Sequence, residues 1–296
     1  MWLLFAILAP FCWGFANPID AALRRNWFKD DLVLMSVFAL TKLPVAVCFL
    51  VLFGQGIVFG WPFFWIFLSG IIWMLAFVFF YHSLQIEEVS RVVLILQFQP
   101  VLIFLIAVAL IHESLNFSQF MAFSLIFIGS ILAAFKKTKS RWHFSKVFLF
   151  IILAGFMWSL ADVIFKKYVI YFPNFWAAFG VDLLGSSLLG GLLFFLPKYR
   201  SLYGGFKLSK IGWTLVFLSA VFGILGSLFF AYALTLGKAS LTTVVIGLQP
   251  LFAMFFGLML SYFIKEISRE SMNKSGLIVK FLSFVLILAG LVYLYL

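Results

Sequence analysis

The feature that most constrains this chain is its succession of long apolar runs with almost no charge. Charged residues make up only 10% of the 296 residues, against about 25% in soluble proteins. A helix needs about 20 apolar residues to cross a bilayer, and continuous runs favour helices over the alternating strands of a barrel. We therefore expect an all-α integral membrane protein with ten transmembrane helices, at residues 2–22, 32–53, 62–84, 88–111, 116–135, 147–166, 173–196, 210–236, 240–263 and 276–296.

Two stretches of the chain occur twice. Residues 5–19, FAILAPFCWGFANPI, and residues 150–164, FIILAGFMWSLADVI, share eight of fifteen positions. Residues 81–102 align with residues 231–252 and place a Gln-Pro pair at the same point of both. The first match relates the first and sixth expected helices, and the second relates the fourth and ninth. The sequence therefore predicts two related units of five helices each.

The number of helices in each unit decides how the units are oriented. Because five is odd, the second unit enters the membrane from the opposite face, so the two repeats are inverted. We expect the first repeat at residues 1–135, a basic connecting loop at 136–146 and the second repeat at 147–296. Inverted repeats around a site near the bilayer midplane are a feature of secondary transporters.

The basic residues lie in short clusters between the apolar runs. Fifteen Lys and Arg residues fall in the loops after the odd-numbered helices, and three fall on the other side. Because cytoplasmic loops are rich in Lys and Arg, we expect these loops in the cytoplasm and both termini outside, in a multi-pass protein of the inner (cytoplasmic) membrane. The net charge of +11 therefore reflects topology, and nucleic acid is not an expected partner.

Motifs for catalysis, metals and cofactors are missing from the sequence. His82, His112 and His143 lack the spacing of metal ligands, and Cys12 and Cys48 lie within apolar runs, as packing residues do. The sequence has no phosphate-binding glycine loop and no nucleophile elbow. We expect no cofactor, no metal and no enzymatic activity.

Several short motifs resemble a known family. CWG in the first helix pairs with MWS in the sixth, and LQFQPV in the fourth pairs with IGLQPL in the ninth. Together with the five-plus-five repeat, these motifs are similar to EamA-type transporters of the drug/metabolite transporter superfamily. The resemblance implies alternating-access transport of small metabolites without hydrolysis of a nucleotide. It also implies a basic residue in the second helix, which Lys42 matches. It further implies a Glu after each proline-containing helix. Glu113 matches in the first repeat, and Glu266 in the second, where the distance from the proline is three residues longer.

Two charged residues lie in the middle of matching helices. Lys42 is central in the second expected helix and Asp182 in the seventh. A charge within the membrane costs about 2.5–3.5 kcal/mol on insertion scales, so such residues are functional candidates. We expect them on opposite walls of one cavity, where Lys42 would bind a carboxylate or phosphate and Asp182 an amine. The alternative is a buried structural pair.

The repeated Gln-Pro pair adds neutral polar groups at mid-membrane. Gln97, Gln99 and Gln249 precede Pro100 and Pro250, and a proline frees the carbonyl four residues before it. We expect the glutamines and the freed carbonyls to form part of the substrate site, with the two prolines as hinges. The alternative is that the glutamines bond to neighbouring helices.

Aromatic residues at matching or nearby positions are candidates for the cavity wall. Trp13 and Trp158 occur in both repeats, and Tyr81 and Tyr232 lie in the third and eighth expected helices. Such walls suit an apolar body or a cation, although packing and lipid contact are the usual roles of membrane aromatics.

Two further polar pairs have simpler interpretations. Glu88 and Arg91 are spaced three apart on one helix face, which predicts a solvated ion pair at the membrane surface. Asn17 and Asp162 match in the first repeat alignment, and we expect either a gate or a water-facing helix end there.

The most favoured function is export of a small amino-acid-like or other polar or amphipathic metabolite. Multidrug export of lipophilic cations and uptake of a charged metabolite are alternatives, and a channel or an intramembrane enzyme is a poorer fit. The first helix offers Trp13 and Gly14, but no acid, in its middle, which weakens simple proton exchange. The expected partners are a small-molecule substrate, membrane lipid and a coupling proton or ion, and a monomer is sufficient.

Overall fold

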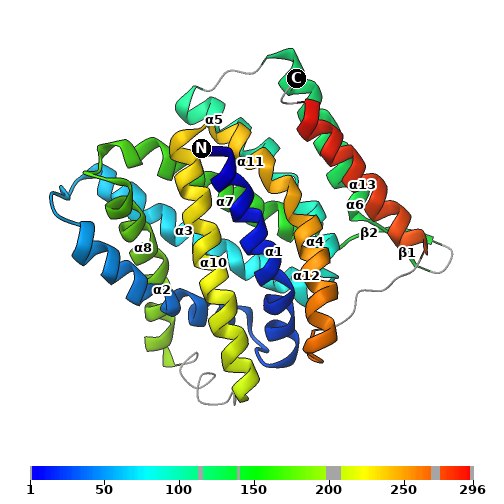
Figure 1. Cartoon of the computed structure of the whole chain (residues 1–296), viewed down its shortest axis with the longest axis horizontal. Helices are drawn as coiled ribbons and strands as arrows, with labels where there is room; N and C mark the ends of the chain where they lie inside the picture. Colours follow the sequence, from blue (N-terminus) through cyan, green and yellow to red (C-terminus); the bar gives the residue numbers. More distant parts are fainter. Residues whose placement is uncertain (1, 113–115, 139–140, 198–207, 268–273, 294–296) are drawn as a thin grey trace.

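The computed structural model describes residues 2–112, 116–138, 141–197, 208–267 and 274–293. The chain is a bundle of long helices (Figure 1). The helices of the first half are α1 (Trp2–Asn26), α2 (Asp31–Phe53), α3 (Trp61–Ile86), α4 (Val89–Leu96), α5 (Gln99–Ile111) and α6 (Phe117–Ala134). Those of the second half are α7 (Phe148–Tyr168), the 3-10 turn η1 (Val169–Tyr171), α8 (Phe175–Phe195), α10 (Lys210–Leu236), α11 (Ala239–Val244), the 3-10 turn η2 (Val245–Leu248), α12 (Gln249–Phe263) and α13 (Lys274–Tyr293).

Eight helical segments in the described part of the chain are long and apolar enough to cross a membrane. They are α1, α2, α3, α4 with α5, α7 with η1, α8, α10, and α11 with α12. The fifth and tenth expected spans correspond to α6 and α13, which are helical and pack against each other but are not among these eight. An all-helical membrane fold is therefore confirmed, and the number ten stays a prediction.

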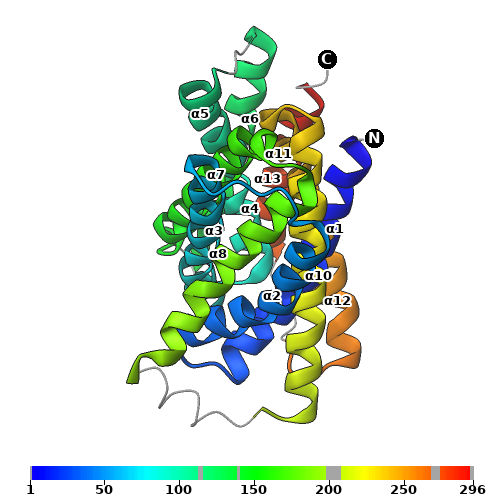
Figure 2. The same ribbon diagram turned by 90° about the vertical axis from the view of Figure 1, so that its left-hand side faces the viewer.

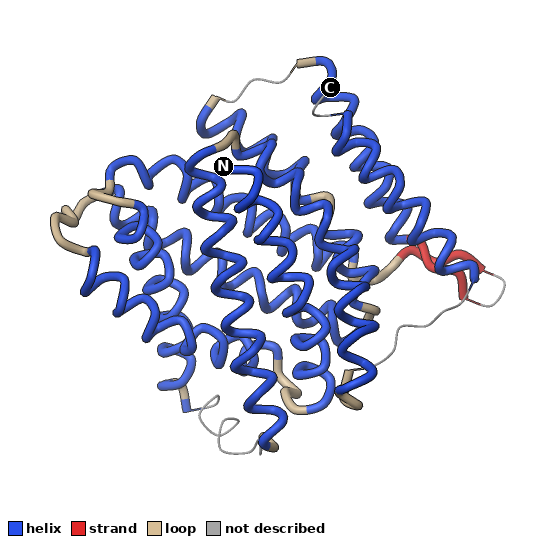
Figure 3. Tube along the Cα trace, viewed as in Figure 1, coloured by secondary structure: helices blue, strands red, loops and turns tan. Residues whose placement is uncertain are grey.

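The basic connection between the two halves differs from the expected loop. Strand β1 (Phe135–Thr138) pairs with β2 (Arg141–Phe144) in an antiparallel ribbon, with Phe135 opposite Phe144 (Figure 3). Pairing between the two strands satisfies backbone N–H and C=O groups that a plain loop would leave open. The expected loop at 136–146 is therefore mostly a two-stranded ribbon.

Polar side chains determine where several helices begin. The Asp30 carboxylate accepts bonds from the backbone N–H groups of Leu32 (2.8 Å) and Val33 (3.2 Å), and so caps α2. Asn174 caps α8 in the same way, and Ser209 caps α10. Such caps satisfy donors that a helix start leaves unpaired. They set the register of α2 and α8, the helices that carry Lys42 and Asp182.

Two of the expected helices are broken just before their prolines. The run 88–111 is divided at Gln97 and Phe98 into α4 and α5, and the run 240–263 is divided by η2 into α11 and α12. Pro100 and Pro250 each occupy the second residue of the new helix, a position that needs no N–H. The Ile246 carbonyl, which the sequence predicted to be free, accepts from the Gln249 N–H instead, because the chain tightens into a 3-10 turn there.

Helices of the first half pack mainly against helices of the second half. Helix α1 contacts α10 and α12, and α7 contacts α3 and α5. Helix α2 packs against α8, and α6 against α13, as the two views of the ribbon show (Figures 1 and 2). The start of α1 and the end of α13 lie at the same end of the molecule in both views.

Glycines allow α3 and α8 to cross closely at the centre. A Cβ on Gly70 would lie 1.9 Å from the Asp182 carbonyl oxygen, and one on Gly185 would lie 2.0 Å from the Phe67 carbonyl oxygen. Small residues at crossings let membrane helices approach to backbone contact. This crossing places Asp182 beside α3.

Candidate functional site

The polar residues at the centre of the bundle line three small cavities that share walls. Trp73 of α3 belongs to the wall of all three. The lysine chamber, of about 20 Å³, is lined by Lys42 and Asp182. The aromatic chamber, of about 60 Å³, includes Trp158, and the tyrosine chamber, of about 40 Å³, includes Tyr81. Because the walls are shared, we treat the three chambers as one central site.

Lys42 comes from α2 and is almost fully buried. Its ammonium lies 4.1 Å from the centre of the Trp73 ring and 5.9 Å from that of Phe77. Aromatic faces attract a cation, and more strongly when water is excluded. Lys42 lines both the lysine chamber and the tyrosine chamber.

Asp182 of α8 lies in the wall of the same chamber as Lys42. Its Oδ1 lies 2.8 Å from the hydroxyl oxygen of Ser69 on α3. The ion pairs found in the described part of the chain do not include Lys42 with Asp182. The structure therefore brings the two charges to one chamber without joining them within 4 Å.

Asp162 of α7 is buried. Of the two expectations for this residue, a gate or a water-facing helix end, the second is therefore wrong. It lines both the lysine chamber and the aromatic chamber. The Gln99 amide nitrogen lies 3.5 Å from its Oδ2. The repeat alignment singled out Asp162 as the partner of Asn17, which also lines the aromatic chamber.

Asp20 is a site residue that the sequence analysis missed. The expected first helix ended at residue 22, but α1 continues to Asn26, so that Asp20 lies inside the bundle and is buried. The Ser219 hydroxyl on α10 donates to its Oδ1, and Asp20 lines the aromatic and tyrosine chambers. The first helix therefore does carry an acid at the cavity. The spacing of three between Asn17 and Asp20, in an otherwise apolar run, was the available signal.

The glutamines separate into two groups. Gln99 and Gln249, one from each half, line the aromatic chamber. Gln97 is buried, donates its amide to the Val93 carbonyl (3.1 Å) and is in the wall of none of the three chambers. Gln97 therefore bonds to its own helix α4, which is neither the expected cavity position nor the alternative of a bond to a neighbouring helix. Pro100 and Pro250 follow directly after the two cavity glutamines.

The aromatic candidates also separate. Trp13 and Trp158 line the aromatic chamber, and the Trp158 Nε1 donates to the Trp73 carbonyl at 2.9 Å. Tyr81 lines the tyrosine chamber. Tyr232 is in the wall of none of the three, because it packs edge-on against Phe5 with a centroid distance of 4.9 Å and joins an aromatic cluster.

Trp73 was not among the residues that the sequence singled out. It lies at the centre of the site, since its ring faces the Lys42 ammonium and its carbonyl holds Trp158. Position 73 has no aromatic counterpart in the second half at the offset of 150, where Gly223 stands. The repeat therefore gave no signal for it.

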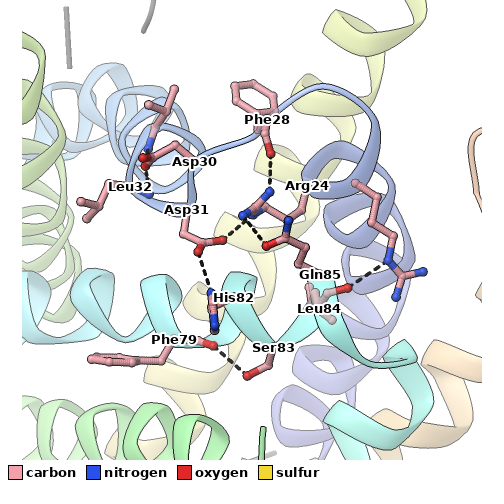
Figure 4. Close-up of polar contacts among 12 residues, drawn as sticks. Arg24, Phe28, Asp30, Asp31, Leu32, Phe79, His82, Ser83, Leu84 and Gln85 are labelled. Atoms are coloured by element: carbon pink, nitrogen blue, oxygen red, sulfur yellow. Dashed lines mark hydrogen bonds and ion pairs between the residues drawn. The ribbon is translucent and has the colours of Figure 1, made fainter. Parts of the chain in front are cut away.

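A polar network lies at the end of the bundle that contains the α1–α2 turn (Figure 4). Arg24 donates to the carboxylate of Asp31, to the Phe28 carbonyl (2.6 Å) and to the Gln85 side chain (2.7 Å). The His82 Nδ1 lies 3.1 Å from the second Asp31 oxygen. These bonds tie the end of α1 and the start of α2 to the end of α3.

The neighbouring arginine binds backbone carbonyls at the same end. The Arg25 guanidinium donates to the carbonyls of Leu84 (3.0 Å) and Glu87 (2.6 Å), at the C-terminal end of α3. We call these bonds the Arg25 contact. Carbonyls at a helix C-terminus carry partial negative charge and favour a cation.

The ion pair of Arg91 differs from the expected one. Arg91 lies 3.7 Å from Glu87, four residues earlier, and both side chains are buried. The expectation of a solvated arginine at the membrane surface was wrong, because Arg91 is buried beside Glu87. The Ser145 hydroxyl donates to the same Glu87 carboxylate at 3.3 Å.

A second cation binds helix-end carbonyls at the opposite end of the molecule. Lys166 of α7 donates to the carbonyls of Leu234 (3.1 Å) and Gly237, at the C-terminal end of α10. A Cβ on Gly237 would lie 3.3 Å from the Trp2 ring, so this contact lies beside the start of α1. Arg25, in contrast, lies near the C-terminal end of α1. We call these bonds the Lys166 contact.

A comparison of the sequence with known families now decides the class of protein. The profile of the EamA-like transporter family matches residues 1–135 and 145–296. The chain belongs to the EamA-like transporter family. It is therefore a multi-pass membrane protein of a family of solute transporters, not of enzymes, as the resemblance of its motifs implied. Comparison with curated protein sequences finds no match.

The fold of this EamA-like transporter is shared with solved structures. One crystal structure, described simply as that of a protein, aligns with 98% of this chain and 94% of its own, with a TM-score of 0.63 and 15% identity. At that identity the likeness concerns the fold alone. Of the two glutamates that the resemblance implied, Glu113 lies outside the described residues, and the carbonyl of Glu266 accepts a bond from the Asn26 amide at 2.9 Å.

Proposed function

We propose that this EamA-like transporter moves a small polar or amphipathic solute across the membrane by alternating access to the central site. The observation that carries the proposal is that four charged side chains, from α1, α2, α7 and α8, line three chambers with shared walls inside an apolar bundle. They are Asp20, Lys42, Asp162 and Asp182. Burying charge in a membrane is costly, so charges that meet at a cavity are best explained by a solute or ion that binds there.

The inverted-repeat arrangement is part of the proposal, with repeats at 1–135 and 147–296. When two units are related by a twofold axis, each contact between a helix of one unit and a helix of the other occurs a second time between the corresponding helices. The contacts of α1 with α10 and α12 are of this kind, because they match those of α7 with α3 and α5. The pairs α2 with α8 and α6 with α13 each join corresponding helices. This pattern supports two opposed units around the central site.

The two cation contacts support a mechanism with one closure at each end. The Arg25 contact binds the carbonyls of residues 84 and 87, and the Lys166 contact binds those of 234 and 237. The two carbonyl pairs are offset by 150 residues, as are the repeats that contain them. We propose that breaking one contact while the other holds opens the site to one side at a time.

The composition of the walls favours a solute with a polar head and an apolar body. Lys42 and the three carboxylates offer partners for charged or hydrogen-bonding groups, and the tryptophans offer flat apolar surface. An amino-acid-like solute fits both parts. Export, coupling to a proton or ion, a functional monomer, and location in the inner membrane with both termini outside stay predictions of the sequence.

Labelling of one cavity position from each face tests the proposed function without knowledge of the solute. Ser227 lines the lysine chamber, so Ser227→Cys would be the reporter, in a chain with Cys12→Ala and Cys48→Ala. A membrane-impermeant maleimide would be applied to right-side-out and inside-out vesicles. Alternating access predicts labelling from both faces.

Cross-links across each end would make that test specific. One variant would carry Arg25→Cys with Glu88→Cys, and the other Lys166→Cys with Lys238→Cys. Each pair would be oxidised to a disulfide by copper phenanthroline before Ser227→Cys is exposed to the label, since a bis-maleimide would also consume the reporter thiol. Each cross-link should abolish labelling from its own face and leave labelling from the other. Labelling from one face only, whichever end is cross-linked, would show a fixed cavity and contradict the proposal.

A further inference from the structure

The aromatic chamber differs from its neighbours in charge. Asp20 and Asp162 both lie in its wall, whereas its wall contains no Lys, Arg or His. Lys42 lines the other two chambers but not this one. Each acid also shares a chamber wall with Lys42, Asp162 in the lysine chamber and Asp20 in the tyrosine chamber. The aromatic chamber is therefore the part of the central site that is lined by acids and by no base.

The two acids have only neutral partners in the part of the chain that is described. Asp20 accepts from the Ser219 hydroxyl, and Asp162 is 3.5 Å from the Gln99 amide. Neither acid belongs to the ion pairs found there. A hydrogen bond from a neutral donor leaves the charge of a carboxylate uncancelled, so the chamber favours a positive group.

The walls of the chamber suit an organic cation in particular. Three tryptophans and two phenylalanines surround the acids: Trp13, Trp73, Trp158, Phe77 and Phe80. Aromatic faces attract an ammonium group, most strongly where water is excluded, and also pack against its alkyl chain. A hydrated metal ion would gain little from such walls.

One polar group in the wall has no partner within the described residues. The Asn17 side chain is 4% exposed, lines the chamber and leaves its Nδ2 without a hydrogen-bond acceptor. Buried amide donors are normally paired, and an unpaired one costs free energy. This donor calls for an acceptor on the solute, in addition to the cationic group that the two acids favour.

We propose that the aromatic chamber is a binding site for an alkylammonium group, held by Asp162 and Asp20 and enclosed by the aromatic side chains. The chamber of about 60 Å³ takes the head of the solute, and the alkyl body extends past Trp73 into the adjoining chambers. The proposal rests on the proposed transport function and names the class of its solute as primary amines.

Three probes that differ only in their charged groups test this class. Butylammonium carries the ammonium alone, pentanoate the carboxylate alone, and norvaline both on the same carbon chain. The measurement is the thermal unfolding midpoint of the purified full chain, titrated with each probe at constant ionic strength set by sodium chloride. A ligand that binds the folded state raises the midpoint, and the stabilisation grows with the logarithm of one plus its concentration over its Kd.

We expect butylammonium to raise the midpoint and pentanoate to leave it unchanged. Asp162→Asn should weaken the butylammonium response about tenfold or more, because a charge-assisted bond is lost. The matched control is Glu266→Gln, which removes an acid outside all three chambers and should retain the response. Asp162→Glu, which keeps the charge, should recover part of it.

Four outcomes would overturn the proposal: a response to pentanoate, a response to norvaline alone that needs Lys42, a response that survives Asp162→Asn, or no response to any probe. The two-face labelling of Ser227→Cys uses no solute. The labelling result tests alternating access independently of the solute, so a wrong solute class can be distinguished from a wrong mechanism.

Discussion

At the scale of single residues, the centre of the site is the contact between the Lys42 ammonium and the Trp73 ring, whose centre lies 4.1 Å away. Lys42, Asp182 and Gln99 were singled out because a polar residue within an apolar run is conspicuous. Trp73 was not, because one more aromatic in such a run carries no signal until the fold places it beside Lys42. Gln97 was grouped with Gln99, but the break between α4 and α5 lies between them, and Gln97 is in the wall of none of the three chambers.

Lys42 gives a direct test of whether a central charge serves stability or binding. Lys42→Met keeps much of the length of the side chain and the contact with Trp73 while removing a buried cation that lacks an ion-pair partner within 4 Å in the described chain. Because membrane burial of Lys costs about 2.5–3.5 kcal/mol, the variant should unfold at the same or a higher temperature. A marked fall in the thermal midpoint would show that Lys42 is structural.

At the scale of elements, the sequence predicted the helices well and their breaks and ends less well. Every expected span has a helical counterpart, because long apolar runs allow little else in a membrane. The break before each proline depends on local turn geometry, and the extension of α1 to Asn26 depends on bonds that Arg24 and Arg25 make with α2 and α3. Such tertiary bonds cannot be read from hydropathy.

The crossing of α3 and α8 makes a prediction about glycine. Gly185→Ala would place a Cβ 2.0 Å from the Phe67 carbonyl oxygen, so the two helices must separate. We expect a loss of about 2 kcal/mol or more of stability, the range of overpacked cores, measured as a lower thermal midpoint. Gly191→Ala on the same helix meets nothing within 4 Å and should be neutral. Equal midpoints for the two variants would contradict the described crossing.

The break between α4 and α5 makes a prediction about motion. If Pro100 is a hinge, Pro100→Ala restores a backbone N–H and favours a continuous helix. We then expect slower maleimide labelling of Ser227→Cys from at least one face. The control is Pro44→Ala, since Pro44 lies within the unbroken helix α2. Unchanged labelling rates in Pro100→Ala would remove the hinge from the account.

At the scale of the whole molecule, repetition in the sequence predicted more than any single motif. The offsets of 145 and 150 residues indicated two related halves, and the helix contacts of the folded chain follow the same exchange of partners. The paired cation contacts were not predicted, because Arg25 and Lys166 do not align with each other. Only the carbonyls that they bind occupy matching positions, and a carbonyl has no sequence signature.

The central claim is that the two ends of one cavity are closed by opposed, related contacts. The measurement that tests it most directly is the ratio of Ser227→Cys labelling from the two membrane faces in Arg25→Ala and in Lys166→Ala. Each variant removes one cation from helix-end carbonyls and leaves the other contact intact. The account predicts that the ratio shifts toward opposite faces in the two variants. A shift toward the same face in both, or no shift in either, would contradict it.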